Sequence, residues 1–516
     1  MILSMPLAHA EVMPINMPKH KTAKLLRTLQ ENLEEGVYDD LPLDEKGKQS
    51  CRANYLRLLD SGLTTIKRSH FIKRLQSPGV VVFGDYHPLF ESKAAFLSIL
   101  EKMEEPPLLA LGCLRAWRGA PRQIKNPEEL LTDRALDWPF PKEHWTPILA
   151  HAAHKELPIV GLRGKGEERL SEEERYELWT KRLKRAQKLH GGPVFAVVGE
   201  INCAYENLPK RIAKAHIAGS VSAVLLAPAN VYWRLLAKGE DPCLLVAQMK
   251  NGIHAIAPSH PLRRVNAYLA WQADEPELQL PPALAWKPNS IDDNPLPALS
   301  QRISSFFGAS NLFSAPKIYL PRNSTEIDEL LETLSLPERK ALLEKLCANE
   351  SYCSPNGDYI YLARLTLSHL GEEMTHALHL KLSPPNEQGF SFADHYYHHV
   401  LREAVGFMGS KIINPKRAHP SEDELLWLAE DIFSAKGVAA QLALSLIEEE
   451  EQGHFSVPQE IPSQEVLNAL VHMMGYRLGE RLWSQKEASH KARSLIRRPL
   501  QKRGQARTLY IDLVSQ

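Results

Sequence analysis

The stretch GVVVFGDYHPLFESKAAFLSIL, residues 79–100, joins a short apolar run to a helical pattern through a polar turn. The run begins with Gly79 and continues with valines and a phenylalanine, as expected for a strand that is buried on both faces. Gly84 lets the backbone turn, Asp85, Tyr86 and His87 follow, and apolar residues then recur at helical spacing. A strand that leads directly into a helix predicts one repeat of an α/β sheet.

Further apolar runs rich in Val, Leu and Ile follow along the chain, and helical patterns separate most of them. They are PPLLALGCL (106–114), LPIVGLRG (157–164), PVFAVVGE (193–200) and VSAVLLAPA (221–229). This alternation predicts an α/β fold with a mainly parallel sheet sandwiched by helices. The segment CLLVAQMKNGIHAIAP (243–258) predicts a hairpin that closes the sheet, with Asn251 and Gly252 in its turn.

The chain has 516 residues, too many for one ordinary core, and its character changes along its length. A proline-rich, acidic segment separates the strand-rich part from a part in which helical periodicity dominates. We therefore expect an all-α helical domain after the α/β domain. The predicted parts are a helical and partly disordered lead-in (1–76), the α/β domain (77–275), a linker (276–300), the all-α domain (301–485) and a basic, solvated tail (486–516).

The charge of the chain is balanced, with 62 basic and 62 acidic residues. Net charge therefore gives no argument for nucleic acid or an anionic membrane surface as a partner, and no apolar run approaches the roughly 20 residues that span a bilayer. None of the six cysteines forms a C-x-x-C pair, which favours the cytoplasm. The alternative is the periplasm, because Ala-His-Ala at residues 8–10 would suit the cleavage site of a truncated signal peptide.

Polar side chains follow two of the predicted strands. GDYH (84–87) ends the first strand, GEIN (199–202) ends a later one, and each motif leads into a helix. Ligands of parallel α/β sheets bind outside the carboxyl ends of the strands, so Asp85, His87, Glu200 and Asn202 are expected to converge on one cleft. The plainer interpretation is that each motif is a polar turn after its strand.

With these motifs, the segment 79–270 resembles the ChaN-like domain of the haem-binding uptake, Tiki, TraB and erythromycin-esterase superfamily. GDYH is similar to the family's G-E-x-H motif, with Asp85 in the place of glutamate. VFAVVGEINCAYENLPKRI (194–212) is similar to its later G-x-x-H motif, with Asn202 in the place of histidine. HWTPILAHAAHKELPIVGLR (144–163) resembles a helix-to-strand segment of the family, and PSHPLRRVNAYLAW (258–271) resembles the closing segment of long bacterial members.

The resemblance implies a small-molecule binding protein whose ligand is haem or iron. A haem site needs an axial tyrosine or histidine and cations for the propionates. An amide cannot exchange a proton near pH 7, so Asn202 argues against family-type hydrolysis and against an enzyme at this cleft. The residues implied are Asp85, Tyr86, His87, Arg115, Glu200, Asn202, Tyr205 and Arg211. The alternatives are a metal-dependent hydrolase of the Tiki or erythromycin-esterase type, and a degenerate domain that serves as an interaction scaffold.

A second set of polar residues lies in the predicted helices LSHLGEEMTHALH (367–379) and DHYYHHVLREAVGF (394–407). At 100° per residue, these side chains share one face of each helix, and the face of the first helix carries an apolar stripe. Two neighbouring helices would then hold iron or another divalent metal in their interior. The candidate ligands are His369, Glu372, Glu373, His376, His399 and Glu403.

Three interpretations of this second set remain open. Glu373 and His376 have the Glu-x-x-His spacing of di-iron carboxylate bundles. A zinc site of the H-E-x-x-H type would need Glu372 to replace the first histidine and Glu403 to act as the third ligand. The competing interpretation is a buried network of ion pairs and hydrogen bonds, joined by Arg402, that fixes the register of the helices.

Overall fold

The structure, a computed structural model, describes most of the chain. The described residues are 21–39, 55, 59, 62–77, 79–117, 120–132, 140–164, 166–203, 207–215, 220–249, 252–273, 295–309, 315–384, 389–458, 460–485, 488–498 and 502–515. The chain divides into two compact units. One centres on Arg27–Asp274 and is called the α/β unit, and the other centres on Pro295–Gln516 and is called the helical unit.

The α/β unit is built on a sheet of nine strands in the order β1-β8-β9-β7-β2-β6-β3-β5-β4. The strands from β9 to β5 in this order are parallel, while β1, β8 and β4 join antiparallel to their neighbours. The predicted mainly parallel sheet is thus confirmed. The strands are β1 Leu63–Ile66, β2 Gly79–Asp85, β3 Leu108–Arg115, β4 Arg122–Gln123, β5 Pro158–Arg163, β6 Val194–Gly199, β7 Ser220–Leu225, β8 Val246–Met249 and β9 His254–Ile256.

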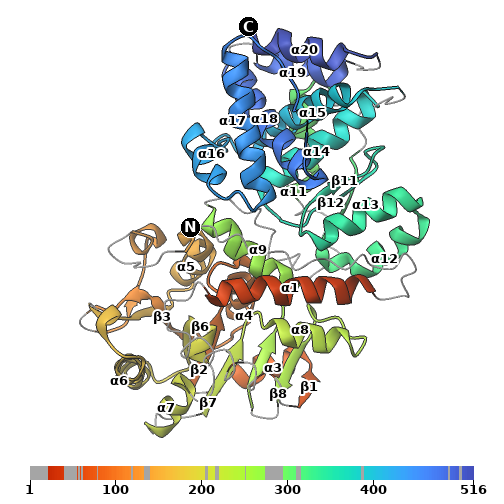
Figure 1. The fold of residues 1–516 in the computed structure, drawn as a ribbon. Coiled ribbons are helices and arrows are strands. Elements are labelled where there is room, and N and C mark those ends of the chain that lie inside the picture. The colour runs from red at the N-terminus through yellow and green to blue at the C-terminus, as the bar shows by residue number, and fades with distance from the viewer. Residues whose placement is uncertain are drawn as a thin grey trace. The chain divides into compact units, whose positions relative to one another are not determined.

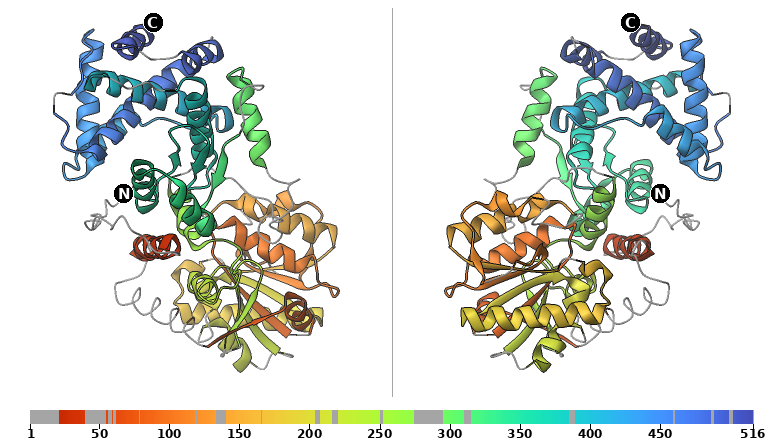
Figure 2. Two further views of the ribbon diagram at one scale, coloured as in Figure 1. Left: turned by 90° about the vertical axis from the view of Figure 1, so that its right-hand side faces the viewer. Right: turned by 90° about the vertical axis from the view of Figure 1, so that its left-hand side faces the viewer.

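Helices cover both faces of this sheet (Figures 1 and 2). On one face, Val81 and Phe83 of β2 pack with side chains of α3 (Arg68–Leu75), α4 (Phe90–Leu100) and α5 (Thr146–His154). On the other face, Val80 and Val82 pack with side chains of α6 (Glu172–His190), α7 (Leu208–Lys214) and α8 (Ala229–Leu236). Successive β2 side chains point to opposite faces, and both sets are buried, which explains the continuous apolar run in the sequence.

The order of the strands creates a crevice at one end of the sheet. Strands β2 and β6 are neighbours, yet the helix after β2 covers one face and the helix after β6 covers the other. The chain therefore leaves the carboxyl ends of two adjacent strands in opposite directions. Such a switch point is where open α/β sheets bind their ligands, and GDYH and GEIN lie on its two sides.

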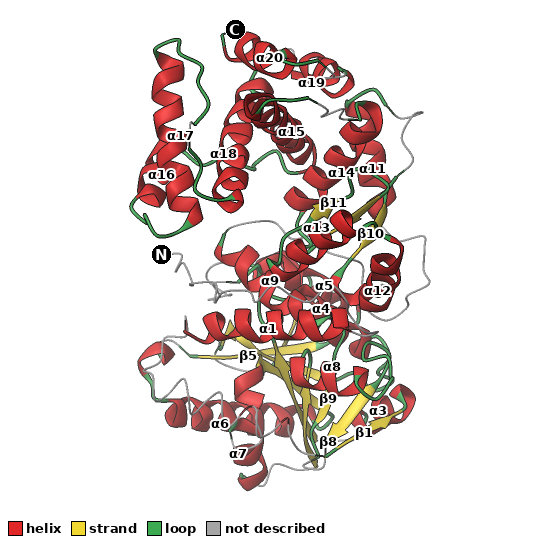
Figure 3. Ribbon diagram, turned by 45° about the vertical axis from the view of Figure 1, so that its right-hand side comes forward, coloured by secondary structure: helices red, strands yellow, loops and turns green. Residues whose placement is uncertain are grey.

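The helical unit is mainly α-helical, as predicted, but it also holds a small sheet in the order β10-β12-β11 (Figure 3). Its strands, of two or three residues each, are too short to show a pattern in the sequence. The elements are α11 Pro295–Phe306, β10 Lys317–Tyr319, α12 Ser324–Thr333, α13 Leu336–Cys347, β11 Tyr352–Cys353, β12 Tyr359–Tyr361, α14 Leu367–Leu382, α15 Phe392–Ile413, α16 Glu422–Ala429, α17 Ala435–Glu451, α18 Gln464–Trp483, α19 Ala488–Arg497 and α20 Gln505–Val514.

Helix α15 is the centre of the helical unit and packs closely against α14 and α18. Glycines allow this approach. A side chain at Gly409 of α15 would collide with Thr375 of α14, and one at Gly479 of α18 would lie 2.8 Å from the carbonyl oxygen of Ala404 in α15. The three helices can therefore bring side chains from all of them to one place.

Two predicted boundaries are corrected. Residues 486–516 were expected to be a solvated tail, but α19 and α20 bury Leu495, Ile496 and Tyr510, because their apolar residues recur at helical spacing. The lead-in at 1–76 contributes α1 (Lys21–Asp39) and the strand β1, which pairs with β8. Residues 276–294 of the predicted linker lie outside the described residues. Its last residues, 295–300, belong to α11.

The predicted hairpin at 243–258 is confirmed, since β8 and β9 pair antiparallel. Its turn residue Asn251 lies outside the described residues, and Gly252 has a positive φ of 82°. Among the residues that the structure describes, no helix combines the length and the apolar character needed to cross a lipid bilayer.

Candidate functional site

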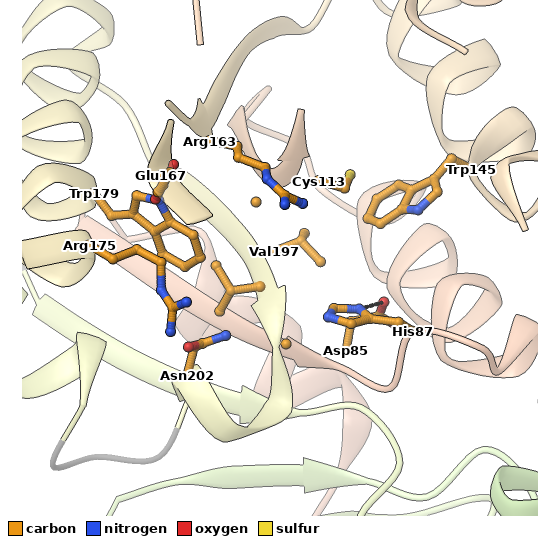
Figure 4. Close-up of a pocket in the computed structure, with 13 residues that line it drawn as sticks. Asp85, His87, Cys113, Trp145, Arg163, Glu167, Arg175, Trp179, Val197 and Asn202 are labelled. Atoms are coloured by element: carbon orange, nitrogen blue, oxygen red, sulfur yellow. Dashed lines mark hydrogen bonds and ion pairs between the residues drawn. The ribbon is translucent and has the colours of Figure 1, made fainter. Parts of the chain in front are cut away.

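A cavity of about 190 Å³ lies at the carboxyl ends of β2, β3, β5 and β6, and it is partly open to solvent. It sits at the switch point of the sheet, where a ligand site is expected. Figure 4 shows the side chains around it. They belong to Asp85, His87, Gly112, Cys113, Trp145, Arg163, Glu167, Arg175, Trp179, Val197, Val198, Gly199 and Asn202.

Asp85, the last residue of β2, is buried and held by three partners. Nζ of Lys93 lies 2.8 Å from Oδ2, Nδ1 of His87 lies 3.0 Å from the same oxygen, and the Ser92 hydroxyl donates to Oδ1 at 2.5 Å. Burial alone raises the pKa of Asp85, but Lys93 and His87 outweigh it and hold the pKa well below its usual range. Asp85 is therefore a carboxylate that orients His87.

His87 borders the cavity with its other ring nitrogen. Burial lowers the pKa of His87, and Asp85 opposes only part of this effect, so the imidazole is neutral near pH 7. A neutral ring that donates from Nδ1 to Asp85 has a lone pair on Nε2. A β-carbon at Gly199 would lie 2.8 Å from Nε2 of His87 and 3.2 Å from Nδ2 of Asn202, so these two nitrogens border the end of β6. Oδ1 of Asn202 accepts a hydrogen bond from Tyr176.

Two arginines add cationic groups to the wall. Arg163 is the last residue of β5 and Arg175 lies near the start of α6, so they reach the cavity from different elements. Both guanidinium groups surround the space that His87 also borders (Figure 4). Arg175 also pairs with Glu172, whose side chain is exposed, at 3.3 Å.

The carboxylates of the wall do not cancel this positive charge, because each has a cation of its own. Asp85 is paired with Lys93. Oε2 of Glu167 lies 3.9 Å from Nη1 of Arg182 and accepts a hydrogen bond from the N–H of Gly164. Among the residues that the structure describes, cations around the cavity therefore outnumber carboxylates, and their field favours an anionic ligand.

Two tryptophans complete the wall. Trp145 and Trp179 are 2% and 6% exposed, and the indole Nε1 of each is buried without a hydrogen-bond partner among the described residues. A buried donor left unpaired costs about 1–3 kcal/mol.

The structure brings three of the eight predicted cleft residues to the cavity: Asp85, His87 and Asn202. Glu200 does not reach it, because a short 3-10 helix (Glu200–Cys203) turns its side chain inward to Arg264 at 2.6 Å and Tyr55 at 3.0 Å. Tyr86 also turns away, and its ring lies 4.1 Å from the Arg264 guanidinium.

The remaining predicted cleft residues are elsewhere. Arg115 is exposed at the end of β3 and does not line the cavity. Arg211 pairs with Glu173 at 3.3 Å, on the outside of α6 and α7. Tyr205 lies outside the described residues. Of the four residues expected to converge, Asp85, His87 and Asn202 line the cavity and Glu200 does not. Tyr86, Arg115 and Arg211, which the resemblance implies as ligand residues, do not line it either.

Sequence reasoning missed Arg163, Arg175, Trp145 and Trp179. Arg163 had a usable signal, because it ends a predicted strand in the same way as Asp85. Arg175 and Trp179 had none, since they lie in a helix whose acid-then-base pattern is that of a solvated helix.

The second set of predicted residues partly converges in the helical unit. Glu372 and His376 of α14 and Glu403 of α15 each offer one atom, and these three atoms lie within 4.8 Å of one another. His376 Nε2 lies 3.9 Å from Oε1 of Glu403. Glu373 faces the other nitrogen of His376, with 3.8 Å between Oε2 and Nδ1.

The other predicted ligands lie apart from this cluster. The ring nitrogen Nδ1 of His369 is 2.7 Å from Oγ1 of Thr366, at the start of α14, where burial lowers the pKa of His369 to about 3. The ring of His399 lies beside that of His398, with 6.0 Å between centroids. His369 and His399 thus do not join Glu372, His376 and Glu403.

Three residues that the sequence did not single out complete the surroundings of Glu372. The Tyr476 hydroxyl donates to its carboxylate at 2.6 and 2.7 Å, and Arg417 contacts Oε2 at 2.9 Å. Nδ1 of His472 lies 3.0 Å from Oε2 of Glu403. His472 and Tyr476 are one turn apart on α18.

Comparison of the chain with protein-family models, with curated proteins and with solved structures finds no match.

Proposed function

We propose that the α/β unit binds a small anionic molecule that carries a carboxylate or phosphate group. The observation that carries this proposal is that Arg163 and Arg175 line one cavity together with His87. Guanidinium groups bind carboxylate and phosphate oxygens through paired, charge-assisted hydrogen bonds. The rings of Trp145 and Trp179 also line this cavity and limit its size.

The size of the cavity favours a ligand smaller than haem. Pockets for drug-sized ligands enclose roughly 300–1,000 Å³, whereas this cavity measures about 190 Å³. Of the tyrosines and arginines that the ChaN-like resemblance implies for haem, Tyr86, Arg115 and Arg211 do not line it, and Tyr205 lies outside the described residues. His87 does, so haem ligation remains an outcome that an experiment can separate from anion binding.

Calorimetric titration of the full chain with sulfate, phosphate and small dicarboxylates tests the proposal. Replacing Arg163 or Arg175 with glutamine is expected to weaken binding about tenfold to a hundredfold, because each removes a charge-assisted contact. Arg211→Gln is the matched control, since Arg211 is a nearby arginine that pairs with Glu173 outside the cavity. Circular dichroism confirms that each variant is folded.

Two results would overturn the proposal. One is a folded wild-type chain that binds none of these anions at millimolar concentration. The other is equal binding by Arg163→Gln, Arg175→Gln and Arg211→Gln. A Soret shift with micromolar hemin that is lost in His87→Ala would instead support the haem ligand implied by the resemblance.

A second candidate is hydrolysis of an ester of such an anion by water. The 3.0 Å contact of Asp85 with Nδ1 of His87 favours it, because a carboxylate that orients a neutral histidine is the arrangement of a general base. A covalent route through Cys113 is disfavoured, since burial raises the pKa of this thiol well above its usual value. Release of p-nitrophenol from its acetate or phosphate ester, lost in His87→Gln, is the expected signature.

A further inference from the structure

We propose that the helical unit binds one divalent first-row transition-metal ion through Glu372, His376 and Glu403. This site is independent of the cavity in the α/β unit. Two carboxylates and an imidazole are ligands that Zn²⁺, Mn²⁺ and Fe²⁺ accept in proteins. The spacing of these groups, an unsatisfied nitrogen of His376 and the residues that orient the ligands all fit a bound metal ion.

The spacing of the three groups fits a common ion. At bond lengths of about 2.1 Å, two ligand atoms in tetrahedral geometry lie about 3.4 Å apart. The observed distance from Nε2 of His376 to Oε1 of Glu403 is 3.9 Å, and all three donor atoms lie within 4.8 Å of one another. Such distances are too long for direct hydrogen bonds and require only a small contraction around a metal ion.

The unsatisfied atom is Nε2 of His376. The side chain is 6% exposed, and Nε2 is buried without a hydrogen-bond partner among the described residues. The position of the His376 ring depends on a glycine, because a side chain at Gly406 of α15 would collide with Nε2 of His376. A network of ion pairs alone would leave this nitrogen unpaired at a cost of about 1–3 kcal/mol, whereas a metal ion would satisfy it.

Neighbouring residues orient the proposed ligands. Tyr476 and Arg417 hold the carboxylate of Glu372, and Nδ1 of His472 lies 3.0 Å from Oε2 of Glu403. Partners of this kind fix the direction of metal ligands and typically change metal affinity by 10–100-fold. Tyr476, Arg417 and His472 are therefore positioning residues.

The experiment measures Zn²⁺ and Mn²⁺ binding to the full chain after EDTA treatment, by calorimetry and by the shift in melting temperature. One ion per chain is expected, with a rise in melting temperature because the ion binds the folded state. His376→Leu and Glu403→Gln are each expected to weaken binding more than about 100-fold, beyond the effect of losing an outer partner. Tyr476→Phe is expected to weaken binding about 10–100-fold while the metal-free protein stays folded, because Arg417 still pairs with Glu372.

His379→Leu is the matched control, because His379 is a buried histidine one turn further along α14 and is not part of the cluster. It is expected to bind the ion like the wild type. The proposal is overturned if the folded wild-type chain binds neither ion, or if His376→Leu and Glu403→Gln bind as His379→Leu does. Should the first two variants fail to fold, an unchanged affinity in Tyr476→Phe would overturn it equally.

Discussion

At the scale of single residues, the α/β site depends on a buried pair. Asp85 and Lys93 have side-chain exposures of 1% and 2%, and their charged atoms lie 2.8 Å apart. Lys93 also donates to the carbonyl oxygens of Tyr86 and His87, so it fixes the turn that carries His87. One cation thus sets both the charge of Asp85 and the backbone around the imidazole.

Lys93→Met is therefore expected to lower the free energy of unfolding by about 3–5 kcal/mol, since it leaves a buried carboxylate without a counter-ion. The double variant Lys93→Met with Asp85→Asn is expected to recover part of this loss, because no buried charge remains. Urea unfolding measures both. Lys102→Met, at an exposed position just after α4, is the control. A loss below 1 kcal/mol in Lys93→Met would contradict the assigned role.

The pKa of His87 gives a pH dependence to anion binding. In the free protein, burial holds this pKa below its usual value, and Asp85 only partly opposes the effect. An anion beside Nε2 favours the imidazolium, so binding takes up a proton. Affinity for sulfate, whose charge is constant over this range, is thus expected to rise as the pH falls from 7.5 to 5.5, by at most tenfold per pH unit. His87→Gln is expected to remove the dependence, and affinity that falls with acidity would contradict it.

The sequence predicts which residues lie at the strand ends but does not always predict where their side chains point. Asp85, His87 and Asn202 could be placed at the cleft because parallel strands end on one edge. Glu200 could not, because its direction is set by Arg264, a residue 64 positions later whose guanidinium binds it at 2.6 Å. A partner so distant in sequence is visible only in the folded chain.

At the scale of elements, the strands of the central sheet were predictable. The apolar run that begins at Gly79 was expected to form a strand, and it forms β2, Gly79–Asp85, because a continuous apolar run flanked by glycine and polar residues admits few other structures. The order of the strands was not predictable, since β6 inserts between β2 and β3 through contacts that no local pattern encodes. The crevice depends on that order.

The close crossing of α15 and α18 rests on Gly475. A side chain there would collide with the β-carbon of Glu403 and would lie 2.9 Å from the carbonyl oxygen of Val400. Because Gly475 lies between His472 and Tyr476 on the chain, its missing side chain allows Glu403 to approach both. The glycine thus links helix packing to the proposed metal site.

Gly475→Ala is expected to lower the free energy of unfolding by about 1–3 kcal/mol through overpacking, although alanine by itself favours a helix by about 1 kcal/mol. The urea midpoint measures this change. Asn468→Ala on the exposed side of the same helix is the control and is expected to leave stability unchanged or slightly higher. A stabilised Gly475→Ala protein would show that the helices can move apart freely.

At the scale of the whole molecule, both units bury histidines in environments that disfavour their charged form. In the α/β unit, burial lowers the pKa of His144 to about 3, of His254 to about 4 and of His260 to about 3. In the helical unit, burial lowers the pKa of His369 and of His379 to about 3. Each unit therefore contains buried histidines whose protonation in the unfolded chain lowers the stability of that unit at low pH.

Acid is therefore expected to destabilise the protein from pH 6.5 downward. The unfolded chain binds protons at the usual histidine pKa of about 6.5, while the folded chain does not until the pH nears 4, so stability is lost as the pH falls between these values. Each such histidine contributes about 1.4 kcal/mol per pH unit, and urea unfolding between pH 7.5 and 5 measures the sum.

The variant His254→Phe tests the contribution of one histidine. Both ring nitrogens of His254 are buried without partners among the described residues, and its ring packs on Phe71 with 5.2 Å between the ring centroids. Its stability should fall less steeply with acidity than that of the wild type, by about the share of one histidine, and equal slopes would show that His254 titrates alike in both states.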